Sequence, residues 1–286
     1  MTLVSLDRVR PRSLTTNNGK FAGIRRIPPT VALAGIFLTI IALWAVVPSL
    51  FTSYAPDYGT PRESLQGPSL QHWFGTDHIG RDLFARVVYG TASSVSSALV
   101  AVAIGLVVGS TIGLLAGFLG KWVDSALSRF IDVLLAIPSF LLAVVIVSSL
   151  GFETINAAIA TGVSAVAVFA RIMRAEVISA RQSVFVEASR ILGGSRLQSM
   201  VWHIVPNASR SVFSLAVLQF GMSILIIAGL AFLGYGDPPP ASDWGLLVSS
   251  GKEYTIAPWL VFFPAITIVL TVLSINRISR WLRKTT

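Results

Sequence analysis

Four side chains of types that bind metals lie close together in the chain: His72, Asp77, His78 and Asp82. Imidazole and carboxylate groups are ligands of zinc, so this cluster raises the hypothesis of a metal site. The spacing matches no closed ligand set, and the chain contains no cysteine. The favoured alternative is a solvated loop with an amphipathic helix on a membrane face, and we expect no metal there.

Motifs for catalysis are missing from the sequence. It has no G-x-x-x-x-G-K-[ST] phosphate loop, because Gly19-Lys20 and Gly120-Lys121 both lack the upstream glycine at the required distance. It also has no G-x-S-x-G elbow and no H-E-x-x-H helix. We therefore expect no catalytic residues and no enzyme; if the protein performs work, the energy must come from another chain.

The chain that must position His72, Asp77, His78 and Asp82 is strongly apolar. Hydrophobic residues make up 53% of the 286 positions, charged residues make up 12%, and the mean hydropathy is +0.74. A soluble domain is about one-quarter charged, and a bilayer core about 30 Å thick requires about 20 apolar residues per helix. Uncharged stretches predict an all-α membrane protein with six transmembrane helices, at about residues 30–51, 94–119, 133–151, 154–172, 211–234 and 257–277.

Lysine and arginine are distributed unevenly between the connections. Of the 22, all but Arg62, Arg81, Arg86 and Lys252 fall in the segments 1–26, 121–132, 171–210 and 277–286. These segments lie on the same side of the predicted crossings, and cytoplasmic connections carry such an excess, so we expect both termini in the cytoplasm. No recognition motif accompanies the basic residues, so no nucleic acid partner is expected. Three tryptophans suit the membrane interface: Trp73, Trp244 and Trp259.

Small residues recur every four positions in the predicted second helix, among them Gly105, Gly109, Gly113 and Gly117. Such spacing lets helices in a membrane approach closely, and helix packing is favoured over a moving seam. Because a step of four drifts around a helix with 3.6 residues per turn, we expect the stripe to contact more than one neighbouring helix.

A basic, half-polar segment, EASRILGGSRLQSMVWHIVPN at 187–207, interrupts the apolar pattern. The Gly-Gly pair is expected to break a short helix, after which Ser195 caps a second one. Pro206 is expected to end that second helix and to displace Val205 from helical geometry. The pattern predicts a helix–turn–helix in the cytoplasm beneath the membrane.

The second helix of this segment has one apolar face, formed by Leu197, Met200, Val201, Ile204 and Val205. An amphipathic helix of this kind fits three settings. It can rest on lipid, lie in an ordinary loop, or dock its apolar face into a groove on a soluble partner. Composition alone leaves these three settings nearly even.

The same segment resembles the EAA loop of ABC-importer permeases, which reads Glu-Ala-Ala, then Gly, and in the peptide branch ends in His-Ile-Leu-Pro-Asn. The matching residues are Glu187, Ala188, Ser189 and Gly193, then His203, Ile204, Val205, Pro206 and Asn207, with Ser189 and Val205 as mild departures. FGTDHIGRDLFARVVYG at 74–90, the segment 117–143 and LAFLGYGDPPPASDWG at 230–245 resemble the C-type permease of the dipeptide/oligopeptide and nickel branch. Ala92 stands where that branch usually has Arg, and the usual Gly-Asp pair after Asn276 is missing.

This resemblance implies a type I importer permease fold in a bacterial inner membrane, with a cytoplasmic tail at 1–26 and a permease domain at 27–286. It implies a homologous second permease, two cytoplasmic ATPase subunits and an extracytoplasmic substrate-binding protein as partners. ATP and Mg would be bound by the ATPase subunits, and this chain would bind no cofactor directly. The implied cargo is a peptide, with glutathione or a nickel chelate as alternatives.

The resemblance also assigns an ATPase-coupling role to residues of the EAA loop: Glu187, Ala188, Gly193, Ser195, Arg196, Met200, His203, Ile204 and Pro206. In the predicted fifth helix, Gln219, Met222 and Ser223 are candidates to line the pathway, although Gln219 also suits a bond to a neighbouring helix. An autonomous secondary transporter is the less favoured alternative, because the predicted spans carry ionisable residues only at their ends.

Overall fold

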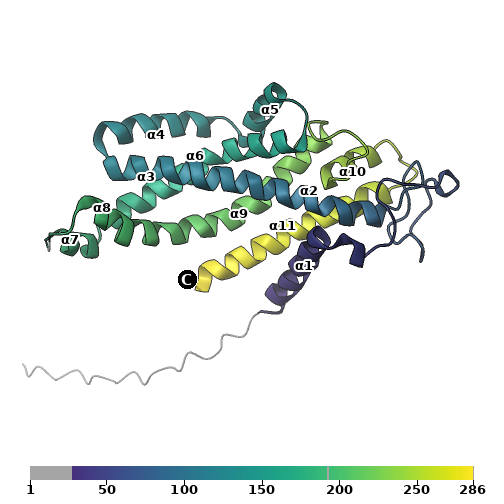
Figure 1. The fold of residues 1–286 in the computed structure, drawn as a ribbon, viewed down its shortest axis with the longest axis horizontal. Helices are drawn as coiled ribbons and strands as arrows, with labels where there is room; N and C mark the ends of the chain where they lie inside the picture. The colour runs from purple at the N-terminus through teal and green to yellow at the C-terminus, as the bar shows by residue number, and fades with distance from the viewer. Residues whose placement is uncertain (1–27, 192, 286) are drawn as a thin grey trace, which may run out of the picture.

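The computed structural model describes residues 28–191 and 193–285, and these residues form helices joined by turns and loops without any strand (Figure 1). Five helical segments in this part of the chain are long and apolar enough to cross a membrane, and a bent helix pair adds a sixth when it is counted as one span. The all-α class predicted from the sequence is therefore confirmed. The six are α1 (Pro29–Val46), α2 to α3 (Leu83–Leu119), α4 with α5 (Lys121–Ala136 and Ser139–Leu150), α6 (Thr154–Arg181), α8 to α9 (Arg196–Phe232) and α11 (Trp259–Thr285).

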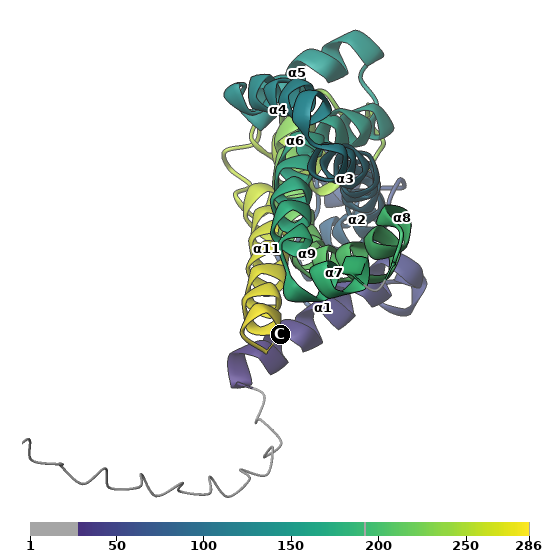
Figure 2. The same ribbon diagram turned by 90° about the vertical axis from the view of Figure 1, so that its left-hand side faces the viewer.

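Helix α6 lies at the centre of the bundle. It contacts α2, α3, α5 and α9, while α11 packs between α9 and α1 (Figures 1 and 2). Two short helices mark the opposite ends of the molecule: α7 (Val184–Ile191) with α8 at one, and α10 (Trp244–Gly251) with the loop 47–82 at the other. The predicted tail at 1–26 lies outside the described residues.

The second spanning helix begins eleven residues earlier than the predicted start at residue 94. Helix α2 starts at Leu83, where the carboxylate of Asp82 accepts a hydrogen bond from the Ala85 amide at 2.7 Å and so caps the helix. Arg86 lies in the first turns of α2 and is buried against protein. The helix therefore extends beyond the predicted span, because Arg86 has protein partners and does not end it.

The predicted third span at 133–151 falls on two helices and not on one. Residues 121–150 form α4 and α5, which meet at a bend of 91°. The break falls at Ile137 and Pro138, where Ile137 adopts extended geometry with φ −93° and ψ 127°. A proline disfavours helical geometry in the residue before it, and this effect separates the two helices.

The four glycines of the stripe all face α6. Gly105 approaches Ala165 and Phe169, and Gly117 approaches Val177, closely enough that a Cβ would overlap with them. A π-helical segment, η3 (Gly105–Gly109), lies between α2 (Leu83–Ile104) and α3 (Ser110–Leu119). A π turn holds more residues than an α turn, so it counteracts the drift of a four-residue repeat. The glycine part of the stripe therefore packs against α6.

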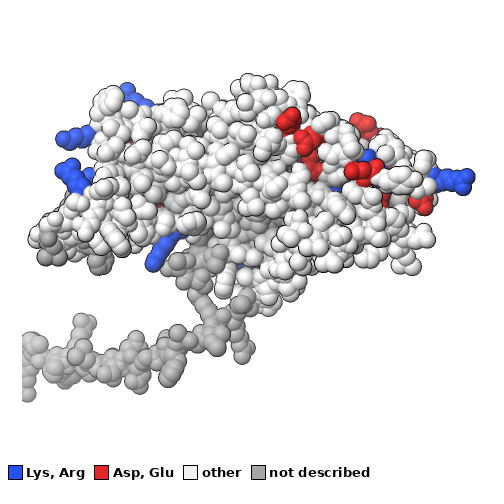
Figure 3. Space-filling view, viewed as in Figure 1, with Lys and Arg blue, Asp and Glu red and all other residues white. Residues whose placement is uncertain are grey.

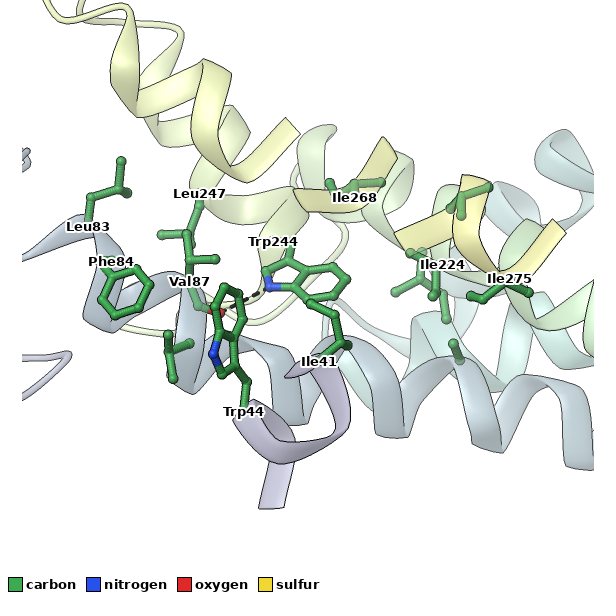
Figure 4. Close-up of a cluster of buried hydrophobic side chains, with 14 of the residues drawn as sticks. Ile41, Trp44, Leu83, Phe84, Val87, Ile224, Trp244, Leu247, Ile268 and Ile275 are labelled. Carbon is green, nitrogen blue, oxygen red and sulfur yellow. Dashed lines mark hydrogen bonds between the residues drawn. The ribbon is translucent and has the colours of Figure 1, made fainter. Parts of the chain in front are cut away.

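A large apolar core joins α1, α2, α9, α10 and α11 (Figure 4). Its largest side chain, Trp244, is fully buried, and its indole N–H donates to the Val87 carbonyl at 3.1 Å. The expected place of Trp244 at the membrane interface is therefore wrong. A tryptophan suits any site where its ring is buried and its N–H finds an acceptor, and the carbonyl on α2 supplies that acceptor here. Trp259 is half-buried and donates to Thr76, while Trp73 is exposed.

Candidate functional site

The segment 184–207 forms one end of the molecule (Figure 1). Helix α7 ends at Ile191, and Gly193 follows with φ +86°, a left-handed geometry that favours glycine. The amide of Gly194 donates to the Ser189 carbonyl at 2.9 Å, and a Cβ on Gly194 would overlap with that oxygen. The Gly-Gly turn therefore folds the chain back against α7.

Ser195 caps the next helix as predicted. Its hydroxyl accepts a hydrogen bond from the Gln198 amide at 3.1 Å, and α8 (Arg196–Ser199) begins directly after it. The hydroxyls of Ser189 and Ser199 lie 3.4 Å apart, so α7 and α8 also meet through a side-chain hydrogen bond.

The expectation that Pro206 ends this helix is wrong. The helix continues from α8 through the π segment η4 (Met200–Ile204) into α9 (Val205–Phe232), and Val205 is helical, with φ −59° and ψ −47°. Pro206 stands in the first turn of α9 directly after the π segment, where a helix tolerates a missing N–H. The Asn207 side chain donates to the His203 carbonyl at 2.7 Å and satisfies one of the carbonyls next to the proline.

The predicted apolar face of this segment is divided between two environments. Ile204 is fully buried in a cluster with side chains of α6 and α9, whereas Leu197 and Val201 are 63% and 52% exposed. Trp202 and Ile191 add to the exposed apolar area at 72% and 80%. These two residues were missed by the periodic pattern, because the π segment and the Gly-Gly turn change which side chains share a surface.

The other residues assigned to coupling surround this area. Met200 and His203 are half-buried; Glu187, Ala188, Gly193, Ser195, Arg196 and Pro206 are exposed. The loop thus exposes both polar and apolar side chains, a mixture that is found in protein interfaces.

The candidates for pathway lining do not share one face of α9. Met222 is 49% exposed and Gln219 is half-buried, but Ser223 is fully buried, and its hydroxyl has no hydrogen-bond partner within the described chain. Adjacent residues on a helix point about 100° apart, because 3.6 residues complete a turn. Ser223 therefore faces the interior of this chain and does not share an exposed face with Met222.

A cavity of about 510 Å³ lies between α6 and α9, on the side of the bundle that carries α8. The sequence-based prediction missed it, since its polar residues are separated by more than thirty positions in the chain. The lining residues are Ile172, Glu176, Asn207, Arg210, Ser211, Ser214, Leu215 and Leu218. Glu176 lies on α6 beyond the predicted end of the fourth span, so a spanning helix carries a charge that the sequence reading placed outside it.

The loop before α2 holds a buried ionic cluster. The Asp77 carboxylate accepts from the Arg81 guanidinium at 2.6 Å and from Arg86 at 3.1 Å, and the side chains of all three are at most 6% exposed. Burial alone raises the pKa of Asp77, but hydrogen bonds from the backbone and side chain of Arg81 and the amide of Ile79 outweigh it. The pKa of Asp77 therefore lies below its ordinary value. The expectation of a solvated loop is therefore wrong for this cluster, whereas residues 53–71 of the same loop are mostly exposed.

Arg86 also binds the second long loop. Its guanidinium donates to the Ala241 carbonyl at 2.8 Å and to Pro240 at 3.3 Å. His72 lies 2.8 Å from Asp82, the cap of α2. The residues of the metal hypothesis are thus engaged in structural contacts, and no group of three or more ligand side chains is found within residues 28–191 and 193–285.

Comparison with protein families gives one match, to the model described as "Binding-protein-dependent transport system inner membrane component", over residues 109–286. Among curated proteins, a dipeptide transport system permease protein of Alkalihalophilus pseudofirmus is 41% identical, over 88% of this chain and 84% of that protein. A glutathione transport system permease protein of Pectobacterium atrosepticum is 33% identical over 98% and 94% of the two chains. A probable D,D-dipeptide transport system permease protein of Escherichia coli is 33% identical over 94% and 91%.

Solved structures give the same fold at lower identity. An amino acid ABC transporter matches with a TM-score of 0.55 and 20% identity, over 70% of this chain and 92% of that chain. An inward-facing methionine ABC transporter also matches with a TM-score of 0.55 and 20% identity, over 70% and 96%. The bundle around α6 is therefore shared with these transporters.

Proposed function

The chain belongs to the family of binding-protein-dependent transport system inner membrane components, and from that premise we propose that its residues 187–207 couple it to a cytoplasmic ATPase. As a member of this family, it is a multi-pass permease subunit of an ABC importer in a bacterial inner membrane. The proposal concerns how this subunit receives the energy of ATP, which its own sequence has no motif to bind.

The exposed apolar side chains at the α7–α8 end support a docking surface. Leu197, Val201 and Trp202 are all more than half exposed, and they lie on a helix that is capped by Ser195. A short helix with a hydrophobic face fits a groove on a soluble partner. Aromatic anchors such as Trp202 contribute most to interfaces of this kind.

The single observation that carries the proposal is the continuity of the helix from Arg196 to Phe232. The end that docks and the span that crosses the bundle belong to one helical segment of 37 residues. A displacement of α8 is therefore transmitted along α9 without an intervening loop. When ATP closes the partner subunits, they would bind one position of α8 more tightly than the other. This difference in binding free energy would shift the permease between its two conformations.

The assembly that this role requires contains four further subunits. We place two ATPase subunits in the cytoplasm, one below each permease, with a homologous second permease beside this chain and a substrate-binding protein outside. ATP and Mg belong to the ATPase subunits in this arrangement. Lys and Arg gather at the end with α4 and α8, and Asp and Glu gather toward α10, which supports a cytoplasmic position for the α8 end (Figure 3).

The cargo that we propose is a short peptide. Two of the relatives compared above are named as dipeptide permeases, and the third carries glutathione, itself a small peptide. Glutathione is therefore a second candidate cargo. We place the selectivity for the cargo in the binding protein, so the passage through the permease needs to bind the cargo only weakly.

The coupling proposal is tested by copurification of the ATPase with tagged permease from membranes. We expect Leu197→Asp and Val201→Asp to lose the ATPase, because a carboxylate in the apolar contact stays unpaired on docking. Trp122→Asp is the matched control: Trp122 is 82% exposed at the start of α4, at the same end of the molecule but outside the proposed surface. Retention of the ATPase by both the Leu197→Asp and the Val201→Asp variant would exclude this surface.

The orientation is tested separately by labelling of single cysteines, which the cysteine-free chain makes unambiguous. Arg196→Cys should react with a membrane-impermeant maleimide only in opened cells. Tyr58→Cys, at a position 78% exposed in the loop at the other end, should react in intact spheroplasts. The reverse pattern would overturn the assignment of the α8 end to the cytoplasm.

A further inference from the structure

Two charges of opposite sign line the cavity between α6 and α9. Glu176 comes from α6 and Arg210 from α9, and the space between the helices measures about 510 Å³. Within the part of the chain that the structure describes, neither side chain makes a hydrogen bond or an ion pair. The cavity therefore offers an unpaired carboxylate and an unpaired guanidinium to whatever enters it.

Two arginines on α6 are bound by other parts of the chain, whereas Glu176 is bound by none of the described residues. On the same helix as Glu176, Arg174 is bound by Asp124 through two hydrogen bonds of 2.5 and 2.8 Å. Arg181, also on α6, donates to the Gly117 carbonyl at 2.6 Å. Glu176 is half-buried and Arg210 is exposed, so a ligand that enters the cavity can reach both charges.

The remaining walls suit a small polar ligand. Asn207, Ser211 and Ser214 place an amide and two hydroxyls on the α9 side, and Leu215 and Leu218 add apolar area. A cavity of this volume falls in the range of small-molecule sites. Amide and hydroxyl groups match the donors and acceptors of a peptide backbone.

Beyond the cavity, α9 carries further partly exposed apolar side chains. Leu218, Met222 and Leu225 follow one another at intervals of four and three residues and so share a face of the helix. Met222 and Leu225 are 49% and 41% exposed in this single chain. This weakly apolar strip leads into the charged cavity at the α8 end.

We propose that the cavity is a transient exit site for a zwitterionic peptide, with the α-ammonium at Glu176 and the α-carboxylate at Arg210. The inference rests on the proposed peptide cargo and specifies which of its groups this chain contacts. Charge-assisted hydrogen bonds orient the peptide, and the open, partly exposed walls keep the binding weak. The site holds the cargo during the conformational change and releases it into the cytoplasm.

The test uses the complete transporter with its partner permease, ATPase subunits and binding protein in proteoliposomes. Uptake of radiolabelled alanyl-alanine is measured over a range of concentrations for the wild type, Glu176→Gln and Arg210→Gln. We expect both variants to lower the maximal rate about tenfold, the effect of losing one charge-assisted contact. The half-saturating concentration and the ATP hydrolysis stimulated by the binding protein should stay unchanged, because the binding protein captures the peptide first.

Arg171→Gln is the matched control, since Arg171 is exposed on α6 and lies outside the cavity lining. Glu176→Asp should retain most of the uptake because it keeps the carboxylate. Wild-type rates in both Gln variants, an equal loss in Arg171→Gln, or a parallel loss of ATP hydrolysis would each overturn the exit site. Absence of alanyl-alanine uptake by the wild-type transporter would instead refute the proposed cargo, and the peptide assignment of the cavity with it.

Discussion

Arg86 and Asp77 form a buried ion pair of 3.1 Å that joins the start of α2 to the loop before it. The same guanidinium binds the Ala241 carbonyl, so one side chain connects two loops that are far apart in the chain. Both long loops at this end of the molecule are therefore held in one arrangement. A binding protein that docks there would meet a preformed surface.

Removal of the charge on Asp77 should destabilise the protein strongly. Asp77→Asn leaves Arg81 and Arg86 buried without their carboxylate, and breaking such a pair costs about 3–5 kcal/mol. We expect a melting temperature lower by roughly 5–10 °C for the detergent-purified complex. Glu253→Gln, at an exposed acidic position of the neighbouring loop, should leave it unchanged.

The contribution of Asp77 should also depend on pH. Its pKa in the folded protein is lower than the ordinary value of 3.8, so the stabilisation is present above that value and is lost as the pH falls toward the folded pKa. The difference in melting temperature between the wild type and Asp77→Asn should be constant near neutral pH and shrink below about pH 4. A difference that is unchanged at low pH would mean that the Asp77 charge is not the cause.

Gly113 of α3 packs so closely against α6 that the stability of the protein should depend on the absence of a side chain there. A Cβ on Gly113 would overlap with the Ala170 carbonyl oxygen, whereas a Cβ on Gly35 of α1 would have nothing within 4 Å. Gly113→Ala should therefore reduce stability by about 1–3 kcal/mol through overpacking, and Gly35→Ala should not reduce it. Thermal unfolding of the two variants checks this, and equal melting curves would contradict the contact.

The ion pair between Arg174 and Asp124 should contribute less, because its two side chains are 33% and 23% exposed. Arg174 donates two hydrogen bonds to Asp124, which makes this ion pair stronger than an ordinary surface pair. We expect Asp124→Asn to lower the free energy of unfolding by about 1 kcal/mol. A double-mutant cycle with Arg174→Gln isolates the coupling between the two residues. Asp132→Asn, an exposed carboxylate on the same helix, serves as the control.

Because the helix runs without a break from α8 into α9, we expect that Pro206 is not required for transport. Pro206→Ala should import peptide at the wild-type rate, since the helix already runs through this position. The double variant Val205→Gly/Pro206→Gly should bind the ATPase but lower uptake about fivefold, because two glycines create a flexible joint between docking end and span. ATPase copurification measures the docking of the partner, and the uptake assay measures transport, so the two assays together separate docking from the transmission of movement. Full uptake by the double-glycine variant would show that a rigid connection is not required.

The sequence by itself determined the class and the family. A charge content of 12% in long apolar runs permits membrane helices and little else, and the EAA-like segment with the Gly-Thr-Asp and Pro-Pro-Pro loops identified the permease family, as the comparisons confirm. The cap at Ser195 was also predictable, since the hydroxyl, the glycines before it and the amide that it accepts from are neighbours in the chain. These properties depend on composition and local chemistry.

Only the tertiary structure decided where helices end and which polar groups meet. Arg86 does not interrupt α2 because Asp77 and the Ala241 carbonyl satisfy it, and Pro206 does not interrupt α9 because it follows a π segment. The cavity between Glu176 and Arg210 depends in the same way on how α6 packs against α9. The free energy of a charge or a proline in a helix is set by its partners in space, and a linear pattern does not contain those partners.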